Sequence, residues 1–174
     1  EVVKIIRDTL PSTIIVGDSA QPIYAANLYY DHDRPSGWFN SATGFGALGY
    51  AAPASVGAQL GAPGSTVVCL TGDGGLQFSL AELGSAKDID APVIFVVWNN
   101  NGYQEIETSM VDAGIKPVGV TPQAPDFGLI AKSYGIDFAR PTSLGAFASA
   151  LTDALQSKAP CLIDLDEMVA ESGA

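Results

Sequence analysis

Apolar and polar positions follow two alternating patterns along this chain. Short runs such as IIV, VVCL and VIFVVW are entirely apolar, which indicates strands buried on both faces of a sheet. Between these runs, apolar residues recur every three or four positions, as they do in amphipathic helices. The predicted strands cover residues 13–17, 66–74 (ending in a glycine turn), 91–100, 136–141 and 160–166, and the predicted helices cover residues 4–10, 20–30, the second half of 41–61, 76–88, 126–135 and 143–157.

Doubly apolar strands that alternate with helices predict an α/β fold. The expected architecture is a doubly wound, mostly parallel sheet with helices on both faces. Asp126 and Ser143 stand at the start of two predicted helices, where a short polar side chain can cap the first turn. Residues 103–124 have weak periodicity and predict a loop region with one short helix. No repeat or internal linker is visible, so residues 1–174 are expected to form a single domain.

Charge and cysteine content narrow the range of partners. The chain carries 19 acidic and 8 basic residues and shows no Lys/Arg cluster, so nucleic acid and acidic membrane surfaces are not expected partners. The longest apolar run, Val93 to Trp98, is too short to cross a bilayer. Cys69 and Cys161 lie in apolar runs without CxxC spacing, which predicts buried thiols of a cytoplasmic protein. The only histidine, His32, is expected in a solvated polar loop.

Polar residues follow two of the predicted strands at the point where each strand ends. Asp73 follows one, within GDGG, and Asn99 to Asn101 follow the next. Ligands of open parallel sheets bind at the carboxyl ends of strands, and these two strands are expected to be neighbours. Each motif alone could be only a turn. Together they offer carboxylate, amide and backbone oxygens, the donors that Mg²⁺ prefers, next to a helix start that suits a phosphate anion.

A second glycine motif, GFGALG at residues 44–49, fits the dinucleotide-binding pattern GxGxxG. That pattern needs a strand before it and an acid about 20 residues after it. The preceding SGWFNSAT makes a poor strand, and no acid lies between Gly49 and Asp73. Two interpretations of this motif therefore stay open: a dinucleotide-binding oxidoreductase domain, or glycines that only let a helix pack closely on the sheet.

At this point the motifs resemble a known family. GDG, followed after 24 residues by NNN, resembles the thiamine diphosphate motif of acetolactate synthases and 2-oxoacid decarboxylases. GFGALGYAAPASVGA and IIVGDSAQ resemble other segments of the C-terminal diphosphate-binding domain of that family, so the resemblance covers essentially the whole chain. It implies the thiamine diphosphate-binding fold, thiamine diphosphate and Mg²⁺ as cofactors, and an enzyme that decarboxylates a 2-oxoacid, ligates the resulting aldehyde unit, or does both.

The resemblance also implies roles for individual residues. Asp73, the Asn100 side chain and the Gly102 carbonyl would bind magnesium. The residues that would contact the cofactor are Ser19, Ala20, Gln21, Gly46, Leu48, Gly72, Gly74 and Gly75. Among them, the Gly74 and Gly75 amides would hold the diphosphate, and the Gly46 carbonyl would accept a hydrogen bond from the cofactor's 4'-amino group. Leu48 would separate the two cofactor rings, with an ordinary core leucine as the less favoured alternative.

Part of the family's active site is not expected in this chain. Its activating glutamate belongs to a pyrimidine-binding domain, usually of the partner subunit, and no candidate motif for it occurs here. Since the chain also begins with Glu1 rather than Met, we expect a fragment of a three-domain enzyme that is a homo-oligomer, a dimer or tetramer, and is inactive without the other domains. A non-catalytic assembly module is the competing possibility, which the intact pair of Asp73 and Asn100 disfavours.

The sequence leaves the substrate open. Synthases of this type often carry His after the glutamine of the first loop, whereas Pro22 follows Gln21 here. The reaction could therefore be acetolactate synthesis, simple decarboxylation or aldehyde ligation of a small 2-oxoacid. Glu105 and Glu107 could meet a cationic substrate such as a guanidino 2-oxoacid, or could be exposed helix carboxylates.

Overall fold

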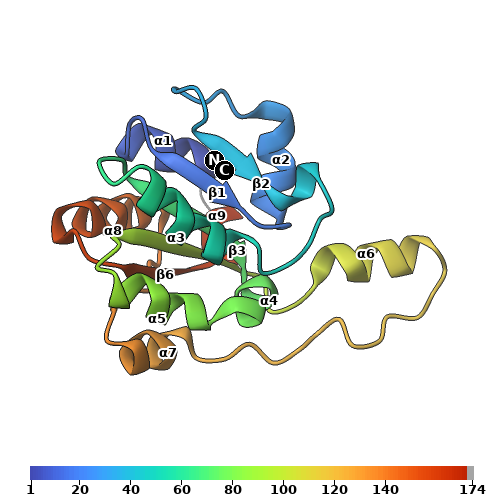
Figure 1. The fold of residues 1–174 in the computed structure, drawn as a ribbon. Coiled ribbons are helices and arrows are strands. Elements are labelled where there is room, and N and C mark those ends of the chain that lie inside the picture. Colours follow the sequence, from blue (N-terminus) through green and yellow to red (C-terminus); the bar gives the residue numbers. More distant parts are fainter. Residues whose placement is uncertain (172–174) are drawn as a thin grey trace.

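The computed structural model describes residues 1–171 and contains one six-stranded sheet. The sheet has the order β2-β1-β3-β4-β6-β5, and every neighbouring pair of strands is parallel (Figure 1). The strands are β1 (Ile14–Gly17), β2 (Trp38–Asn40), β3 (Val67–Gly72), β4 (Val93–Asn99), β5 (Asp137–Ala139) and β6 (Cys161–Asp166). The α-helices are α1 (Val2–Thr9), α2 (Gln21–Tyr29), α3 (Ala51–Gly61), α4 (Asp73–Leu76), α5 (Ala81–Asp88), α6 (Gln104–Asp112), α7 (Phe127–Tyr134), α8 (Leu144–Ser157) and α9 (Glu167–Glu171).

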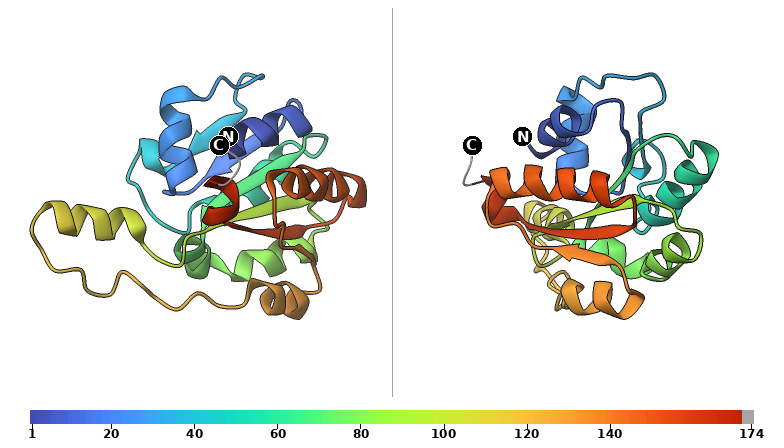
Figure 2. Two further views of the ribbon diagram at one scale, coloured as in Figure 1. Left: turned by 180° about the vertical axis from the view of Figure 1, so that it is seen from behind. Right: turned by 90° about the vertical axis from the view of Figure 1, so that its left-hand side faces the viewer.

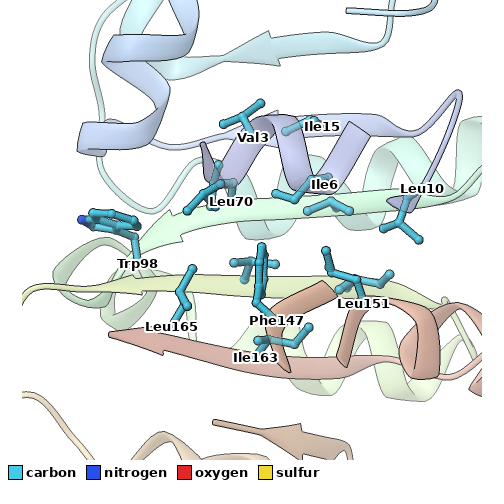
Figure 3. Packing of buried hydrophobic residues seen from close by; sticks show 14 of the residues in the cluster. Val3, Ile6, Leu10, Ile15, Leu70, Trp98, Phe147, Leu151, Ile163 and Leu165 are labelled. Carbon is cyan, nitrogen blue, oxygen red and sulfur yellow. The ribbon is translucent and has the colours of Figure 1, made fainter. Parts of the chain in front are cut away.

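Two hydrophobic cores lie on opposite faces of the sheet. Val68 and Leu70 of β3 pack with α1, α2 and α8 on one face, while Val67 and Cys69 pack with α3, α5 and α7 on the other. Figure 3 shows the first of these cores, and the two further views in Figure 2 show how helices cover the sheet. Because both faces are covered, β3 and β4 need apolar side chains at nearly every position, which confirms the predicted α/β class.

The connections around β1 create a place for a ligand. β1 lies between β2 and β3, and the chain leaves it towards β2 through α2 on one face and returns towards β3 through α3 on the other. This reversal of strand order opens a crevice at the carboxyl ends of β1 and β3. Gly17, the last residue of β1, pairs with Leu70, so β3 extends two residues further and its end lies beside the loop that follows β1.

Several local predictions are confirmed. Asp126 Oδ1 accepts from the backbone N–H of Gly128 at 2.9 Å, and Ser143 Oγ accepts from that of Ala146 at 3.1 Å, so both residues cap their helices. The region from residue 103 to 124 contains one short helix, α6, which projects from the body with the chain that follows it (Figures 1 and 2). Both cysteines are buried free thiols, and burial raises the pKa of Cys161 to about 12.

Three local predictions are wrong. The SGWFNSAT segment does form a strand: Trp38–Asn40 pairs with β1 at the sheet edge, where a strand this short, with two of its residues partly exposed, leaves little periodic signal. The helix predicted at residues 76–88 is divided into α4, a 3₁₀ turn at Gln77–Ser79 and α5. Residues 167–171 form the short helix α9, which was not predicted.

None of the helices in residues 1–171 combines the length and apolar character needed to cross a membrane.

Candidate functional site

All eleven residues singled out as ligands by resemblance line one cavity of about 150 Å³. It lies at the carboxyl ends of β1, β3 and β4, in the crevice described above. The lining residues from that set are Ser19, Ala20, Gln21, Gly46, Leu48, Gly72, Asp73, Gly74, Gly75, Asn100 and Gly102. Four segments far apart in the sequence thus meet at one place. The cavity is also lined by Tyr24, Trp98, Tyr103, Glu105 and Ile106, of which the sequence singles out only Glu105.

Three oxygen atoms converge on one side of this cavity. The side-chain oxygen of Asn100 lies 3.1 Å from Asp73 Oδ1 and 3.0 Å from the carbonyl oxygen of Gly102. Adjacent ligands around an octahedral Mg²⁺, at about 2.1 Å from the ion, are themselves about 3 Å apart. The opposite orientation of the amide would let Asn100 donate to both oxygens instead. With its oxygen inward, the cluster has the spacing and the hard donors that a small divalent cation requires.

One oxygen of the Asp73 carboxylate has no hydrogen-bond partner among the residues that the structure describes. Its side chain is 1% exposed, and Oδ2 is buried without a hydrogen bond. Burial raises the pKa of Asp73, although backbone N–H groups, that of Gly74 first, oppose the shift. No group of three or more His, Cys, Asp or Glu side chains within residues 1–171 could hold a metal ion. A cation here would therefore depend on one carboxylate supplemented by amide and carbonyl oxygens.

The two glycines after Asp73 are required by packing. A Cβ atom at Gly74 would clash with the ring of Tyr103, and one at Gly75 would lie 2.7 Å from Asp18 Oδ2. Contacts this short need a rearrangement of the cavity wall. The glycines therefore let Tyr103 and Asp18 approach the first turn of α4, whose backbone lines the cavity.

The glycine-rich segment is held in place by a buried carboxylate that sequence reasoning missed. Asp18 is 0% exposed, and its oxygens accept from the backbone N–H of Gly49 at 2.8 Å and from Thr71 Oγ1 at 3.1 Å. They also accept from Ser19 N and Ser41 Oγ at 3.1 and 3.3 Å. Asp18 therefore ties three segments of the cavity together. The sequence does contain a pattern that could have identified Asp18, because Asp18 follows the apolar strand β1 just as Asp73 follows β3.

Backbone conformation also shapes the glycine-rich wall. Gly46 has φ +74° and Gly49 has φ +82°, in the left-handed region that side chains disfavour. The N–H of Gly46 donates to the carbonyl of Ser41 at 2.9 Å, which leaves its own carbonyl outside that turn. Leu48 is half-buried and lines the cavity, so the structure places it at the site rather than in either hydrophobic core.

A polar side chain links the first loop to the asparagine loop. Gln21 Oε1 accepts from Trp98 Nε1 at 3.0 Å and from Asn100 Nδ2 at 3.3 Å. Asn100 Nδ2 also donates to Gln104 Oε1 at 2.9 Å. In this orientation of the amide, the nitrogen of Asn100 lies towards the glutamines and its oxygen towards Asp73. Of the two glutamates considered for substrate binding, Glu105 lines the cavity and Glu107 does not.

Comparisons with known proteins agree with this arrangement. Residues 4–165 match the family "Thiamine pyrophosphate enzyme, C-terminal TPP binding domain". The chain is 35% identical to the "Probable 2-ketoarginine decarboxylase AruI" of Pseudomonas aeruginosa over 92% of this chain and 29% of that protein. It is 32% identical to the acetolactate synthase large subunit of Parasynechococcus marenigrum, over 95% of this chain and 27% of that one.

A solved structure is similar over the same extent. The thiamine diphosphate-dependent 4-hydroxybenzoylformate decarboxylase of Rhodococcus jostii RHA1 superposes with a TM-score of 0.83 and 29% identity, covering 93% of this chain and 31% of that one. The chain thus spans between about a quarter and a third of the length of these relatives. The match includes the GFGALG segment, so the dinucleotide alternative is set aside. The chain belongs to the thiamine pyrophosphate enzyme family, of which it is the C-terminal thiamine pyrophosphate-binding domain.

Proposed function

We propose that Asp73, Asn100 and the Gly102 carbonyl bind Mg²⁺, and that this ion bridges the chain to the diphosphate of thiamine diphosphate. The observation that carries the proposal is that the Asn100 side-chain oxygen lies about 3 Å from both Asp73 Oδ1 and the Gly102 carbonyl oxygen, beside a buried carboxylate oxygen without a partner. Buried polar atoms are nearly always hydrogen-bonded, and an exception at a cavity favours a missing ligand. A divalent cation would satisfy the carboxylate that burial alone destabilises.

The remaining lining residues are proposed to hold the organic part of the cofactor. Gly72, Gly74 and Gly75 are proposed to present their backbone to the diphosphate at the end of β3, and residues 19–21 line the same cavity. Gly46 and Leu48 are proposed to meet the rings, since both line the cavity on the glycine-rich side. When bound, thiamine diphosphate supplies the electron sink for loss of CO₂ from a 2-oxoacid. The contribution of this chain is positioning, which orients the cofactor and fixes its charge.

We propose further that the chain is one of three domains of a homo-oligomeric enzyme acting on a 2-oxoacid. The relatives are three to four times as long, and those compared above are an acetolactate synthase subunit and decarboxylases. Phe45, next to cavity residue Gly46, is 100% exposed and would pack against a pyrimidine-binding domain of the same or partner subunit.

A cationic 2-oxoacid is the second candidate for the substrate. The observation in its favour is that Glu105 lines the cavity, on the first turn of α6. In the full-length enzyme, Glu105→Gln is expected to lower kcat/KM for a guanidino 2-oxoacid by about tenfold relative to that for pyruvate, since a charge-assisted contact is worth roughly 1.5–3 kcal/mol. Glu107→Gln is the matched control. Equal changes for both substrates in Glu105→Gln would remove this candidate.

The test of the cofactor site is calorimetric titration of the full-length protein with thiamine diphosphate, in Mg²⁺ and then in EDTA. Binding is expected with Mg²⁺, with a large loss of affinity in EDTA and in Asp73→Ala. Cofactor binding that is insensitive to both changes would mean that Asp73 and the metal have no part in it. A protein that binds no cofactor under either condition would favour the non-catalytic assembly module.

A further inference from the structure

A second polar cluster lies beside the proposed magnesium loop, near the carboxyl ends of β4 and β6. It consists of Asn99, Asp164 and Arg140, which are joined by hydrogen bonds. Asp164 is 2% exposed, although its neighbours on β6, from Cys161 to Leu165, are all apolar. A buried carboxylate is destabilising unless it is paired, so its partners explain why it is tolerated at this position.

Both oxygens of Asp164 are engaged. Oδ2 accepts from Arg140 Nε at 2.9 Å and lies 2.8 Å from Arg140 Nη2. Oδ1 accepts from Asn99 Nδ2 at 3.0 Å. A carboxylate paired with a guanidinium can only accept hydrogen bonds. It therefore fixes the amide of Asn99, with the nitrogen towards Asp164 and the oxygen available to another donor.

That oxygen contacts the magnesium loop. Asn99 Oδ1 accepts from the backbone N–H of Asn101 at 3.2 Å and closes an Asx turn. Asn101 has φ +60°, a left-handed conformation that asparagine adopts more readily than most other residues with a side chain, and the hydrogen bond from its N–H to Asn99 closes the turn in that conformation. The turn separates Asn100 from Gly102, which supply two oxygens of the cluster around Asp73. Its geometry decides where those two oxygens lie.

We propose that Asn99 is a positioning residue for Mg²⁺, oriented by Asp164 and Arg140. The inference rests on the proposed magnesium site and adds the means by which its loop is held. Asn99 acts through the backbone of Asn101 and not as a ligand. Mg²⁺ demands near-ideal octahedral geometry, whereas Ca²⁺ accepts irregular arrangements at longer distances. Loosening the loop should therefore weaken Mg²⁺ binding more than Ca²⁺ binding.

The experiment is calorimetric titration of the full-length protein with MgCl₂ and, separately, CaCl₂, in the presence of thiamine diphosphate. Asn99→Ala is expected to weaken Mg²⁺ binding by about 10- to 100-fold, as is usual for residues that orient metal ligands, and Ca²⁺ binding by less. Ser143→Ala removes the cap of α8 and serves as a control for a general loss of stability. It is expected to leave the ratio of the two affinities unchanged.

If Asn99→Ala folds poorly, the proposal can be tested by exchanging the amide of Asn99 and the carboxylate of Asp164. In Asn99→Asp, two carboxylates face each other and the loop should loosen. In the double variant Asn99→Asp/Asp164→Asn, the hydrogen bond is restored with donor and acceptor exchanged and the net charge is kept, so Mg²⁺ affinity should recover.

Two results would overturn the role of Asn99: equal losses of Mg²⁺ and Ca²⁺ affinity in Asn99→Ala, or no recovery in the double variant. Failure of the magnesium site itself gives a different result. In that case Asp73→Ala leaves Mg²⁺ binding unchanged, or the wild-type protein binds no Mg²⁺.

Discussion

Asp73 and Asp164 are chemically alike but are treated in opposite ways by the protein around them. They are 1% and 2% exposed, each lies near the carboxyl end of a strand, and each has an asparagine of the 99–101 loop beside it. Asp164 has hydrogen-bond partners on both oxygens, including a guanidinium. Asp73 has one oxygen without a partner, and the other faces the side-chain oxygen of Asn100.

The difference separates a structural carboxylate from a binding carboxylate. A carboxylate that the protein satisfies contributes to the fold, whereas one that is desolvated and left unsatisfied destabilises the ligand-free protein. Unsatisfied buried groups of this kind are expected mainly at functional sites. The contrast therefore predicts that mutation of Asp73 mainly lowers ligand affinity, whereas mutation of Asp164 lowers the stability of the ligand-free protein.

The largest expected effect is on cofactor affinity in Asp73→Asn. With Mg²⁺ present, the full-length protein should lose more than about 100-fold in thiamine diphosphate affinity, since a ligand matters more than the residues that orient it. Its metal-free stability should not fall. Burial raises the pKa of Asp73 in the folded protein. The folded protein therefore loses stability as pH rises through this pKa and the buried carboxyl becomes charged. The neutral amide of Asn does not ionise and so avoids this loss. Calorimetry measures the cofactor affinity, and denaturant unfolding without metal measures the stability. A clear loss of metal-free stability in Asp73→Asn would contradict the proposed difference between Asp73 and Asp164.

The next effect is on stability in Asp164→Ala. The free energy of unfolding without metal is expected to fall by about 2–3 kcal/mol, because the hydrogen bond and ion pair with Arg140 are lost and Asn99 loses its acceptor. Urea denaturation measures this change. Asp8→Ala is a matched control, because its ion pair with Arg7 is exposed to solvent and should contribute much less to stability. Similar losses in both variants would show that Asp164 is no more important than a surface charge.

A smaller effect concerns the glycines of the motif. Gly75→Ala should lower stability by about 1–2 kcal/mol and weaken cofactor binding, since its Cβ would lie 2.7 Å from the buried Asp18 carboxylate. Gly57→Ala, in the middle of α3 where an added Cβ would meet no atom within 4 Å, should instead stabilise by roughly 0.5–1 kcal/mol. Thermal unfolding of both variants with and without cofactor is the measurement. Equal behaviour would mean that Gly75 is not constrained by the site.

Many residues of the cavity could be predicted from the sequence because they follow the ends of strands. Asp73 and Asn100 come directly after the mostly apolar strands β3 and β4, and neighbouring parallel strands place their carboxyl ends together. The residues grouped by resemblance do line one cavity. Their individual roles towards metal and cofactor remain predictions, which the titrations and variants proposed for the site address.

The parts that were missed depend on contacts distant in the sequence. The Asn99–Asp164 pair requires β4 and β6 to be neighbours, whereas β5 comes between them in the chain and lies at the sheet edge instead. Asp18 was not recognised because its role depends on Gly49 and Thr71, which only the folded chain brings to it. Local patterns of apolar and polar residues contain no information about such pairings.

The most direct test of the central claim is a crystal structure of the full-length protein with thiamine diphosphate and Mn²⁺ as an anomalous stand-in for Mg²⁺. The account predicts a single metal peak about 2.1 Å from an Asp73 carboxylate oxygen, the Asn100 side-chain oxygen and the Gly102 carbonyl. It predicts no metal at Asp164, whose oxygens stay paired with Asn99 and Arg140. A metal bound at Asp164, or a bound cofactor without metal near Asp73, would contradict it.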